Sequence, residues 1–292
     1  MEIKDLESIS IKNKLVHKVN GTQISVHEDV LSIEEPLEIR LKFHQNQEIV
    51  LQTISVTMRT PGNDFELALG FLFTEGIISD FEAIQSVFHV EKNCALQKKN
   101  SLLVELKEGF TPQLMQADRN FYTTSSCGVC GKSSIEAIKT VSPFKTLEPP
   151  KISISAAILY QLSQKLRLAQ NDFSNTGGIH ASALFSIDGE LLFLQEDVGR
   201  HNALDKLIGK AFAKDLLPLN KHILLLSGRI SFELVQKAAM AGIATVVAIG
   251  APSSLAVELA TECNITLIGF LNENRFNMYC QSSTFSLDTI EN

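Results

Sequence analysis

The sequence lacks any apolar run that approaches the length of a membrane span, and its segment 1–15 is charged and mixed. We therefore expect no transmembrane segment and no secretory signal, which makes the cytoplasm the default location. It also lacks an excess of positive charge, because 26 basic residues stand against 33 acidic ones and the net charge is −7. This balance does not favour wrapping a nucleic acid, so neither a nucleic acid nor a membrane is expected as a partner.

Cysteine is scarce and irregularly placed. The chain has five cysteines, an odd number, which argues for reduced thiols and against a disulfide scaffold. Cys263 and Cys280 are too far apart to form a second Cys-x-x-Cys pair, and Cys94 is isolated. No histidine lies between His89 and His180, which excludes a local zinc site of two cysteines and two histidines. The ligand count therefore predicts no tightly bound metal ion.

What the sequence does have is one close pair of thiols, Cys127 and Cys130, each followed by a glycine. Ser133 and Glu136 have the spacing of a capping box, so a helix is predicted to begin just after the pair. A helix N-terminus and the ammonium group of Lys132 both favour thiolate over thiol. A structural zinc site and a dithiol redox site of thioredoxin type stay open as alternatives. The pair is most typical of a loop thiol that carries sulfur or attacks covalently.

The first half of the chain is predicted to be rich in strands. From 23 to 57, apolar residues mostly alternate with polar ones, as in half-buried antiparallel strands. A helix is predicted to follow Asn63, which can cap it, and to stop at Gly76. Prolines at 143, 149 and 150 indicate a boundary. We expect an N-terminal β-rich α+β region, residues 1–145, that carries the cysteine pair, and a C-terminal domain, residues 146–292.

The second half alternates between strands and helices, which indicates the α/β class. Apolar strands are predicted over 222–226, 245–249 and 265–270, with helices over 232–241 and 255–263 between them. This order implies right-handed βαβ crossovers and a parallel sheet covered on both faces. Before these elements the sequence predicts a helix over 155–169, a hairpin of 181–187 with 191–195, and a helix over 202–212.

Loops at the carboxyl ends of these strands favour anion binding. Ser227-Gly228-Arg229 and Gly250-Ala251-Pro252-Ser253-Ser254 each place small residues and hydroxyls just before a helix N-terminus, where N–H groups attract phosphate. Capped βα loops have the same composition, so both interpretations stay open. Two glycines precede His180, so the backbone there can approach a ligand, although a lone histidine is more often structural.

The polar segment 196–202 is a further candidate, because it lies between a buried strand and a helix. Arg200 and His201 stand at the start of that helix, where an anion could again bind. The structural alternative is that Asn202 caps the helix and Asp197 pairs with Arg200.

Several segments together resemble the FdhD family, the accessory sulfurtransferases needed for formate dehydrogenase activity. The resemblance runs from about residue 20 to about residue 281, which is nearly the whole chain. The segments are Cys-Gly-Val-Cys-Gly at 127–131, Thr-Gly-Gly-Ile-His at 176–180, Glu-Asp-Val-Gly-Arg-His-Asn-Ala-Leu-Asp-Lys at 196–206, Ser-Gly-Arg-Ile-Ser-Phe-Glu at 227–233 and Ala-Pro-Ser-Ser-Leu-Ala at 251–256.

The resemblance implies a three-layer core similar to the cytidine deaminase fold, and a homodimer. It implies a sulfurtransferase that accepts sulfur from a cysteine desulfurase and passes it to the bis-molybdopterin guanine dinucleotide cofactor of formate dehydrogenase, whose catalytic subunit is the client. Cys127 would carry the persulfide and Cys130 would assist. The alternative is a non-enzymatic cofactor chaperone that docks on the apo-dehydrogenase, for which an exposed thiolate is unnecessary.

The family's cofactor-binding segment corresponds to Phe270-Leu271-Asn272-Glu273-Asn274-Arg275, in the C-terminal domain. Family members often have a basic residue and a glycine where this chain has Asn272 and Glu273. A deaminase activity is not expected, because neither half of the deaminase zinc signature is present around His180 or Cys127. We expect the anion-binding candidates to complete the cofactor site, namely His180, Arg200, His201, Ser227, Arg229 and Ser253.

Overall fold

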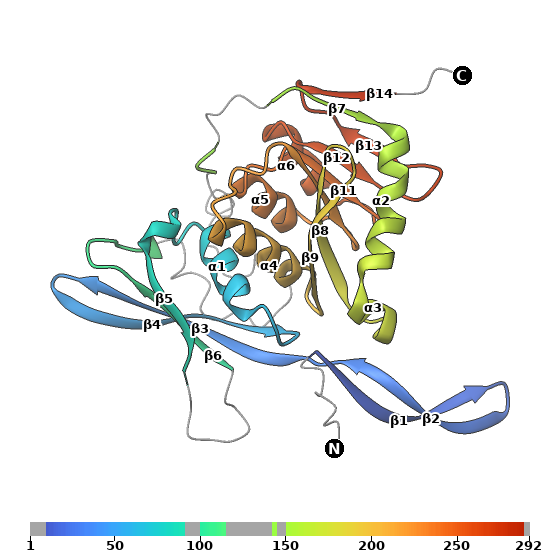
Figure 1. The fold of residues 1–292 in the computed structure, drawn as a ribbon, viewed down its shortest axis with the longest axis horizontal. Helices are drawn as coiled ribbons and strands as arrows, with labels where there is room; N and C mark the ends of the chain where they lie inside the picture. The colour runs from blue at the N-terminus through green and yellow to red at the C-terminus, as the bar shows by residue number, and fades with distance from the viewer. Residues whose placement is uncertain (1–9, 91–99, 115–141, 145–149, 289–292) are drawn as a thin grey trace, which may run out of the picture.

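The computed structural model describes residues 10–90, 100–114, 142–144 and 150–288. Cys127 and Cys130, and the helix predicted to follow them, lie outside these ranges. No helix within them is long and apolar enough to span a membrane. The chain is a mixed α/β protein with a β-rich N-terminal region, as the sequence predicts (Figure 1).

The N-terminal region contains a protruding hairpin, β1–β2, and a four-stranded sheet in the order β4-β3-β6-β5. The odd-numbered residues of β3 from Leu37 to Phe43 are buried, and the polar residues between them face the other side. Helix α1 covers the buried face. The bounds are β1 Ile11–Asn20, β2 Gln23–Ser32, β3 Glu35–Gln45, β4 Glu48–Arg59, α1 Asp64–Thr74, the short 3-10 helix η1 Phe81–Ala83, β5 Ile84–His89 and β6 Ser101–Leu106.

Helix α1 starts and stops where the sequence predicts, but its cap differs. Asn63 precedes the helix in a left-handed conformation (φ 54°), and its side chain makes no capping hydrogen bond. Asp64 and Glu66 lie in the first turn, where negative charge stabilises the helix dipole. Gly76 follows the helix with φ 71°, a conformation that glycine adopts without steric cost.

The C-terminal region is built on a six-stranded sheet in the order β13-β12-β11-β10-β8-β9. Strands β10, β11 and β12 are parallel, as predicted, but β8, β9 and β13 join through antiparallel pairings, so the whole sheet is mixed. The β8–β9 hairpin turns at Gly189, where φ is 79°. The bounds are β7 Ile152–Ser155, α2 Ala156–Ala169, α3 Asn171–Thr176, β8 His180–Ser186, β9 Leu191–Asp197, α4 Arg200–Ala213, β10 His222–Leu226, α5 Phe232–Met240, β11 Thr245–Ala248, α6 Ser254–Glu262, β12 Thr266–Gly269, β13 Asn277–Cys280 and β14 Phe285–Asp288.

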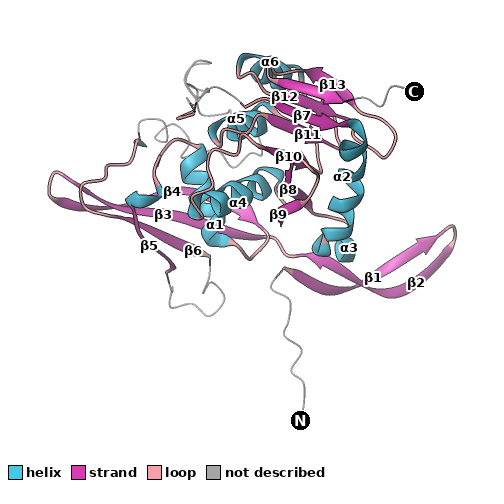
Figure 2. Ribbon diagram, turned by 45° about the horizontal axis from the view of Figure 1, so that its top comes forward, coloured by secondary structure: helices cyan, strands magenta, loops and turns pink. Residues whose placement is uncertain are grey.

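The two faces of this sheet are covered differently (Figures 1 and 2). On one face, Leu159, Leu162 and Leu166 of α2 pack in a cluster with alternate sheet residues such as Phe185 and Leu225. On the other face, helices α4, α5 and α6 pack on the sheet, and α1 packs on α4 from outside. The core on that side is continuous with the core beneath β3, so one hydrophobic cluster spans both halves of the chain.

Helices α1 and α4 touch through their backbones. A Cβ atom added to Gly70 would overlap the carbonyl of Asp205, and one added to Gly209 would overlap the carbonyl of Glu66. Only glycine fits at these two positions, because the opposing backbone cannot retreat without moving a helix. The crossing fixes the N-terminal region against the C-terminal sheet.

Two buried ion pairs reinforce this junction. Lys206 Nζ lies 2.7 Å from Asp197 Oδ2, and both side chains are at most 1% exposed. The same carboxylate accepts a hydrogen bond from the Thr60 backbone N–H, and Lys206 donates to the Thr60 carbonyl. In the second pair, Lys237 Nζ of α5 lies 3.0 Å from Asp205 Oδ1 of α4. This pair reaches the N-terminal region through Thr74 of α1, whose hydroxyl accepts from Lys237 and donates to Asp205.

The structure around Asp197 and the start of α4 shows that two sequence-based alternatives are wrong. Asp197 pairs with Lys206 and not with Arg200. Asn202 does not cap α4, because the helix begins two residues earlier, after Gly199. Its side chain instead donates to the Met58 carbonyl and to Asp197, which adds to the contact between the halves.

Candidate functional site

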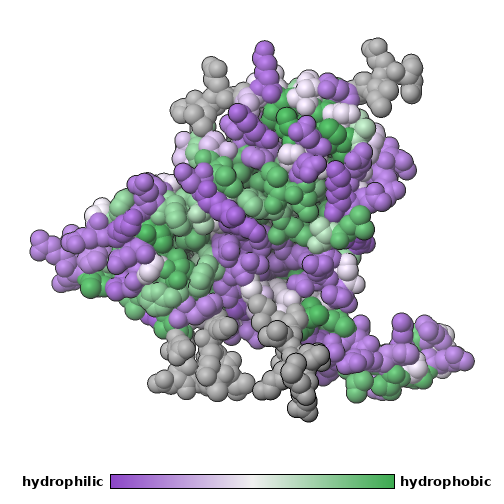
Figure 3. Space-filling view, viewed as in Figure 1, coloured by the Kyte–Doolittle hydropathy of each residue, from purple (hydrophilic) through white to green (hydrophobic). Residues whose placement is uncertain are grey.

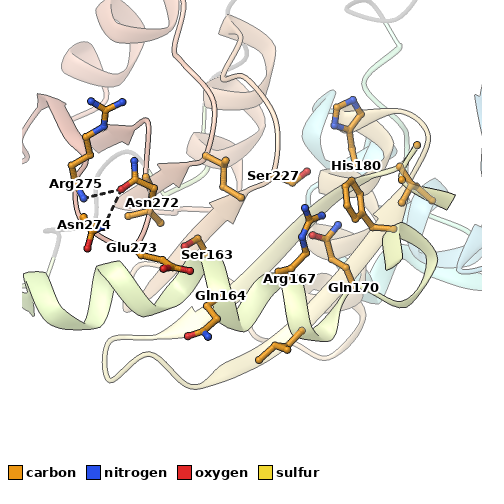
Figure 4. A pocket seen from close by; sticks show the side chains of 17 residues that line it. Ser163, Gln164, Arg167, Gln170, His180, Ser227, Asn272, Glu273, Asn274 and Arg275 are labelled. Atoms are coloured by element: carbon orange, nitrogen blue, oxygen red, sulfur yellow. Dashed lines mark hydrogen bonds between the residues drawn. The ribbon is translucent and has the colours of Figure 1, made fainter. Parts of the chain in front are cut away.

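A cavity of about 1130 Å³ opens at the carboxyl edge of the parallel strands, on the face that α2 covers (Figure 4). It is enclosed by the C-terminal half of α2 with the start of α3, by the loop before β8, and by the residues that follow β10, β11 and β12. In open α/β sheets, ligands bind at this edge of the strands. The lining residues are Ser163, Gln164, Arg167, Leu168, Gln170, Phe173, Gly177, Gly178, Ile179, His180, Ser227, Ile249, Leu271, Asn272, Glu273, Asn274 and Arg275.

The wall formed by α2 presents a positive charge to the cavity. Leu162 and Leu166 turn into the core, which leaves Ser163, Gln164 and Arg167 on the cavity side. The Arg167 guanidinium lies 4.1 Å from the centre of the Phe173 ring, a cation–π arrangement. Among the described residues, no carboxylate lies within ion-pair distance of Arg167. This guanidinium is therefore available to an anionic ligand.

The rim formed by α3 is held in place by a carboxylate. Glu196 accepts hydrogen bonds from the backbone N–H groups of Asp172 and Phe173, at 3.0 and 2.9 Å. These are donors that a helix leaves unsatisfied in its first turn. Burial raises the pKa of Glu196, and the two backbone hydrogen bonds act against that rise. Glu196 thus orients Phe173, and through it Arg167.

The opposite wall is a tight turn after β12. The side-chain oxygen of Asn272 accepts hydrogen bonds from the backbone N–H groups of Asn274 and Arg275, at 2.9 and 3.0 Å (Figure 4). The Asn272 backbone N–H donates to the Arg275 carbonyl. The position that family members often fill with a basic residue thus holds a turn-forming asparagine here. Arg275 is exposed and has no carboxylate partner among the residues that the structure describes.

A second polar cluster lies beyond His180, where α4 and α5 begin. The His201 ring lies 3.3 Å from Ser231 Oγ and 3.8 Å from Glu233 Oε2. Pairing with His201 lowers the pKa of Glu233 to about 2. Burial lowers the pKa of His180, and the charges of Arg200 and His201 lower it further. His180 thus lines the cavity on one side and is close enough to Arg200 and His201 on the other for their charges to affect it.

The structure brings most of the predicted cofactor-binding residues into one place. The residues that line the cavity are His180, Ser227, Leu271, Asn272, Glu273, Asn274 and Arg275. Arg200 and His201 lie in the second cluster. The remaining three do not line the cavity: Phe270 has φ 56° and is 42% exposed, Arg229 is exposed, and Ser253 caps α6 by accepting a hydrogen bond from the Ala256 N–H.

Sequence reasoning missed the α2 side of the cavity. Ser163, Gln164 and Arg167 are the polar stripe of an amphipathic helix, a pattern that ordinarily marks a solvated face. Gln170 and Phe173 follow at the junction with α3, which the sequence analysis did not predict. Nothing in the sequence marks Gln170, because its burial (3% exposed), and hence its need for polar partners, is seen only in the structure.

Within the described ranges, no group of three or more histidine, cysteine, aspartate or glutamate side chains could hold a metal ion. Fold and cavity together define a mixed α/β protein with an open pocket that offers unpaired guanidinium groups, amides and hydroxyls to a polar, anionic ligand. The chain belongs to the FdhD/NarQ family, whose model matches residues 33–286.

Named relatives agree with this assignment over almost the entire chain. The sulfur carrier protein FdhD of Mycolicibacterium paratuberculosis is 47% identical over 277 residues, which cover 94% of this chain and 98% of that protein. The sulfur carrier protein FdhD of Sulfurisphaera tokodaii is 38% identical over 271 residues, covering 93% and 97%. A crystal structure of a proposed formate dehydrogenase accessory protein from Desulfotalea psychrophila shares the fold, with 20% identity, a TM-score of 0.69 and coverage of 95% and 100%.

Proposed function

We propose that this chain is a sulfur carrier required for formate dehydrogenase activity. It takes sulfur from a cysteine desulfurase as a persulfide on Cys127 and transfers it to bis-molybdopterin guanine dinucleotide, which is the substrate held in the cavity. The observation that carries this proposal is the 47% identity, over 94% of the chain, to a protein named as a sulfur carrier. The open cavity with its unpaired arginines supports it.

The cavity has the chemistry that a guanine dinucleotide needs. Arg167 and Arg275 supply charge-assisted donors for phosphate, and they come from opposite walls. Asn272, Gln164 and Ser227 supply amide and hydroxyl groups for the polar edges of a base or a pterin. Because Arg167 and Arg275 have no carboxylate partner among the described residues, binding a phosphate breaks no existing salt bridge there.

Sulfur capture is a thiol exchange at Cys127. Its thiolate attacks the outer sulfur of the donor's cysteine persulfide, the donor's S–S bond breaks, and the donor cysteine leaves as a thiolate. Cys127 then carries the persulfide, and Cys130 assists its release. Lys132 and the helix predicted to begin near Ser133 favour the attacking thiolate form.

Several further features belong to the same proposal. We propose a cytidine deaminase-like core, on the basis of the mixed sheet between α2 on one face and α4–α6 on the other. We propose two regions, 1–145 with the cysteine pair and 146–292 with the cofactor site, a homodimer, and a cytoplasmic location. The client is the catalytic subunit of a formate dehydrogenase, in keeping with the name of the Desulfotalea psychrophila structure.

A non-enzymatic cofactor chaperone is the second candidate. The cavity favours it as much as it favours the carrier, because holding the dinucleotide requires no thiol. The cysteine pair separates the two candidates, since a chaperone that only holds and docks has no use for a reactive sulfur.

Intact-mass spectrometry of the full chain after incubation with a cysteine desulfurase and cysteine tests the proposal. Each captured sulfur adds about 32 Da that a reductant removes. We expect Cys127→Ala to abolish both the added mass and maturation of formate dehydrogenase, and Cys130→Ala to have a milder effect. Cys263→Ala, an exposed cysteine on the C-terminal domain, is the matched control and should load normally. Wild-type maturation activity in Cys127→Ala would leave the chaperone as the better account.

A further inference from the structure

The hairpin of β1 and β2, here called the arm, extends from the rest of the molecule (Figures 1 and 2). It comprises ten residue pairs, from Ile11–Ser32 at the base to Asn20–Gln23 at the tip. At about 3.4 Å per residue, the arm is on the order of 30 Å long. Its base is anchored on α3, because Ser32 Oγ donates to Thr176 Oγ1 at 2.9 Å and Ser10 Oγ donates to Asp172 at 3.0 Å.

The two faces of the arm differ sharply in polarity. Side chains of directly opposed pairs share a face, and successive pairs alternate between faces. One face, here called the apolar face of the arm, carries Leu15, Val19, Ile24 and Val26, which are between 59% and 70% exposed. His17 and Glu28 lie on the same face, paired with Val26 and Leu15, so its apolar surface has polar residues within it. The other carries the lysines of β1 and mostly polar residues of β2. Figure 3 shows this division, with hydrophobic residues along the lower side of the arm.

A two-stranded hairpin of this kind is marginally stable on its own in water. Its apolar face is therefore expected to be covered in the working protein. A partner that covers this face must be present whenever the chain is folded. A second copy of the same chain meets that requirement, because it is always available at matching concentration.

A second exposed apolar surface lies on β4, the edge strand of the N-terminal sheet. Ile49, Leu51, Val56 and Met58, here called the β4 row, are between 48% and 62% exposed. They share a face despite their spacing, because a bulge shifts the register of β3 and β4 between the two pairs of residues. That face is opposite the one on which β3 buries its odd-numbered residues.

The arm and the β4 row lie end to end. Strand β2 leads into β3 through Ile33 and Glu34, and β3 pairs Pro36 with Met58, so the base of the arm adjoins one end of the row. Two copies placed side by side in opposite directions would lay each arm over the other's row. One two-fold rotation thus covers both exposed surfaces in both chains, and the contact closes on itself.

We propose that the apolar face of the arm binds the β4 row of a second copy, reciprocally, and that this contact holds the homodimer of the proposed function together. A buried aliphatic side chain contributes about 60 to 120 Å² of apolar area. The two surfaces together then expose on the order of 500 Å² of apolar area per chain, about the apolar content of a stable interface of some 800 Å² per partner.

The proposal rests on the dimer of the proposed function, so the test begins with the full-length wild-type chain in sedimentation velocity at micromolar concentration. We expect a dimer. In the double variant Leu15→Glu with Ile24→Glu, two more carboxylates would have to be buried without partners in the interface. We therefore expect the dissociation constant of the dimer to rise about 100-fold or more. Lys14→Glu with Lys18→Glu places the same side chains on the opposite face of the arm and should leave the dimer intact.

The row variant Leu51→Glu with Val56→Glu separates the arm-on-row contact from an arm-on-arm contact. The proposal predicts monomers for this variant too, whereas arms that pair only with each other would leave it dimeric, which would overturn the proposal. An intact dimer in the arm variant would overturn it as well while leaving the homodimer standing. A monomeric wild type would overturn both the proposed contact and the homodimer. Far-UV circular dichroism checks that every variant is folded, and sulfur loading on Cys127 is read separately, so failure of the carrier function is distinguishable.

Discussion

The two faces of the six-stranded sheet use charged side chains in opposite ways. On the face packed by α4 and α5, charges are buried and paired with each other: Lys206 with Asp197, and Lys237 with Asp205. On the face covered by α2, Arg167 and Arg275 are exposed on opposite walls of a cavity and have no carboxylate partner among the described residues. The Lys206–Asp197 pair and the cavity are close to the same edge of the sheet, because Asp197 pairs with His180 of the cavity lining.

The difference follows from how much helix covers each face. Where α1 and α4 meet backbone to backbone, water is excluded, and a charge remains there only if another charge and several hydrogen bonds satisfy it. Where α2 alone covers the sheet, a cavity remains at the strand ends, and its guanidinium groups are hydrated by solvent instead of being paired. Paired charge lies at the junction of the two halves, and the two arginines without carboxylate partners line the proposed ligand site.

The largest effect is expected from breaking a buried pair. Lys206→Met keeps the aliphatic length but leaves the Asp197 carboxylate buried without its partner. We expect a loss of about 3–5 kcal/mol in the free energy of unfolding. Lys214→Met, an exposed lysine at the end of the same helix, should cost no more than about 0.5 kcal/mol. Chemical denaturation measures both, and equal stability of the two variants would show that the buried pair does not hold the junction.

An effect of intermediate size is expected on ligand binding. Removing one charge-assisted phosphate contact costs about 1.5–3 kcal/mol, a tenfold or greater loss of affinity. Calorimetry with GDP, a fragment of the full cofactor, should show that loss in Arg167→Gln and in Arg275→Gln, with unchanged stability. Arg229→Gln is the control, because Arg229 is exposed outside the cavity lining. If all three variants bind GDP like the wild type, the cavity is not the phosphate site.

The smallest effect concerns Glu233. This side chain is partly exposed, like the cavity arginines, but is paired with His201, as the buried charges are paired with each other. Its pKa in the folded chain is about 2, below the ordinary value of 4.5. The ionised carboxylate therefore stabilises the fold above about pH 4.5, and that stabilisation is lost as the pH falls toward 2. With solvent screening the loss is roughly 1 kcal/mol.

Unfolding curves measured between pH 5 and about pH 2.5 test this effect. Glu233→Gln should flatten the acid side of the stability profile, whereas Glu258→Gln, which removes an exposed carboxylate of α6, controls for the lost charge. A profile that Glu233→Gln leaves unchanged would mean that the His201 contact contributes nothing to folding.

Much of the fold could be predicted because its signals are local. The apolar strands at 222–226, 245–249 and 265–270, and the helices between them, follow from residue patterns that need no partner. Strand β1 was not predicted, because its lysine-rich sequence becomes a strand only by pairing with β2. The pairing of Asp197 with Lys206 was also missed, since the nearer Arg200 is an equally good partner until the helix geometry is known.

The site was half predictable for a similar reason. Ser227 and His180 were candidates because glycines and polar residues adjoin them next to buried strands, whereas the residues at 271–275 were predicted only from the family resemblance. Arg167 lies in a helix whose polar stripe looks like any solvated surface, and only packing shows that this stripe faces a cavity. Cys127 and Cys130 lie outside the described residues, so their role stays a prediction from sequence.

The glycine crossing of α1 and α4 also sets an order of events during synthesis. Gly70 and Gly209 are about 140 residues apart, and chains grow at about 5–20 residues per second. The ribosome therefore needs roughly 7 to 28 seconds after finishing α1 before it has made the helix that α1 packs against. During that interval β5 and β6 are added and the N-terminal sheet is completed, but the surface that holds its covering helix in place is still missing. The described part of the N-terminal region thus gains the packing surface for α1 only once the chain has been made through Ala213, the end of α4.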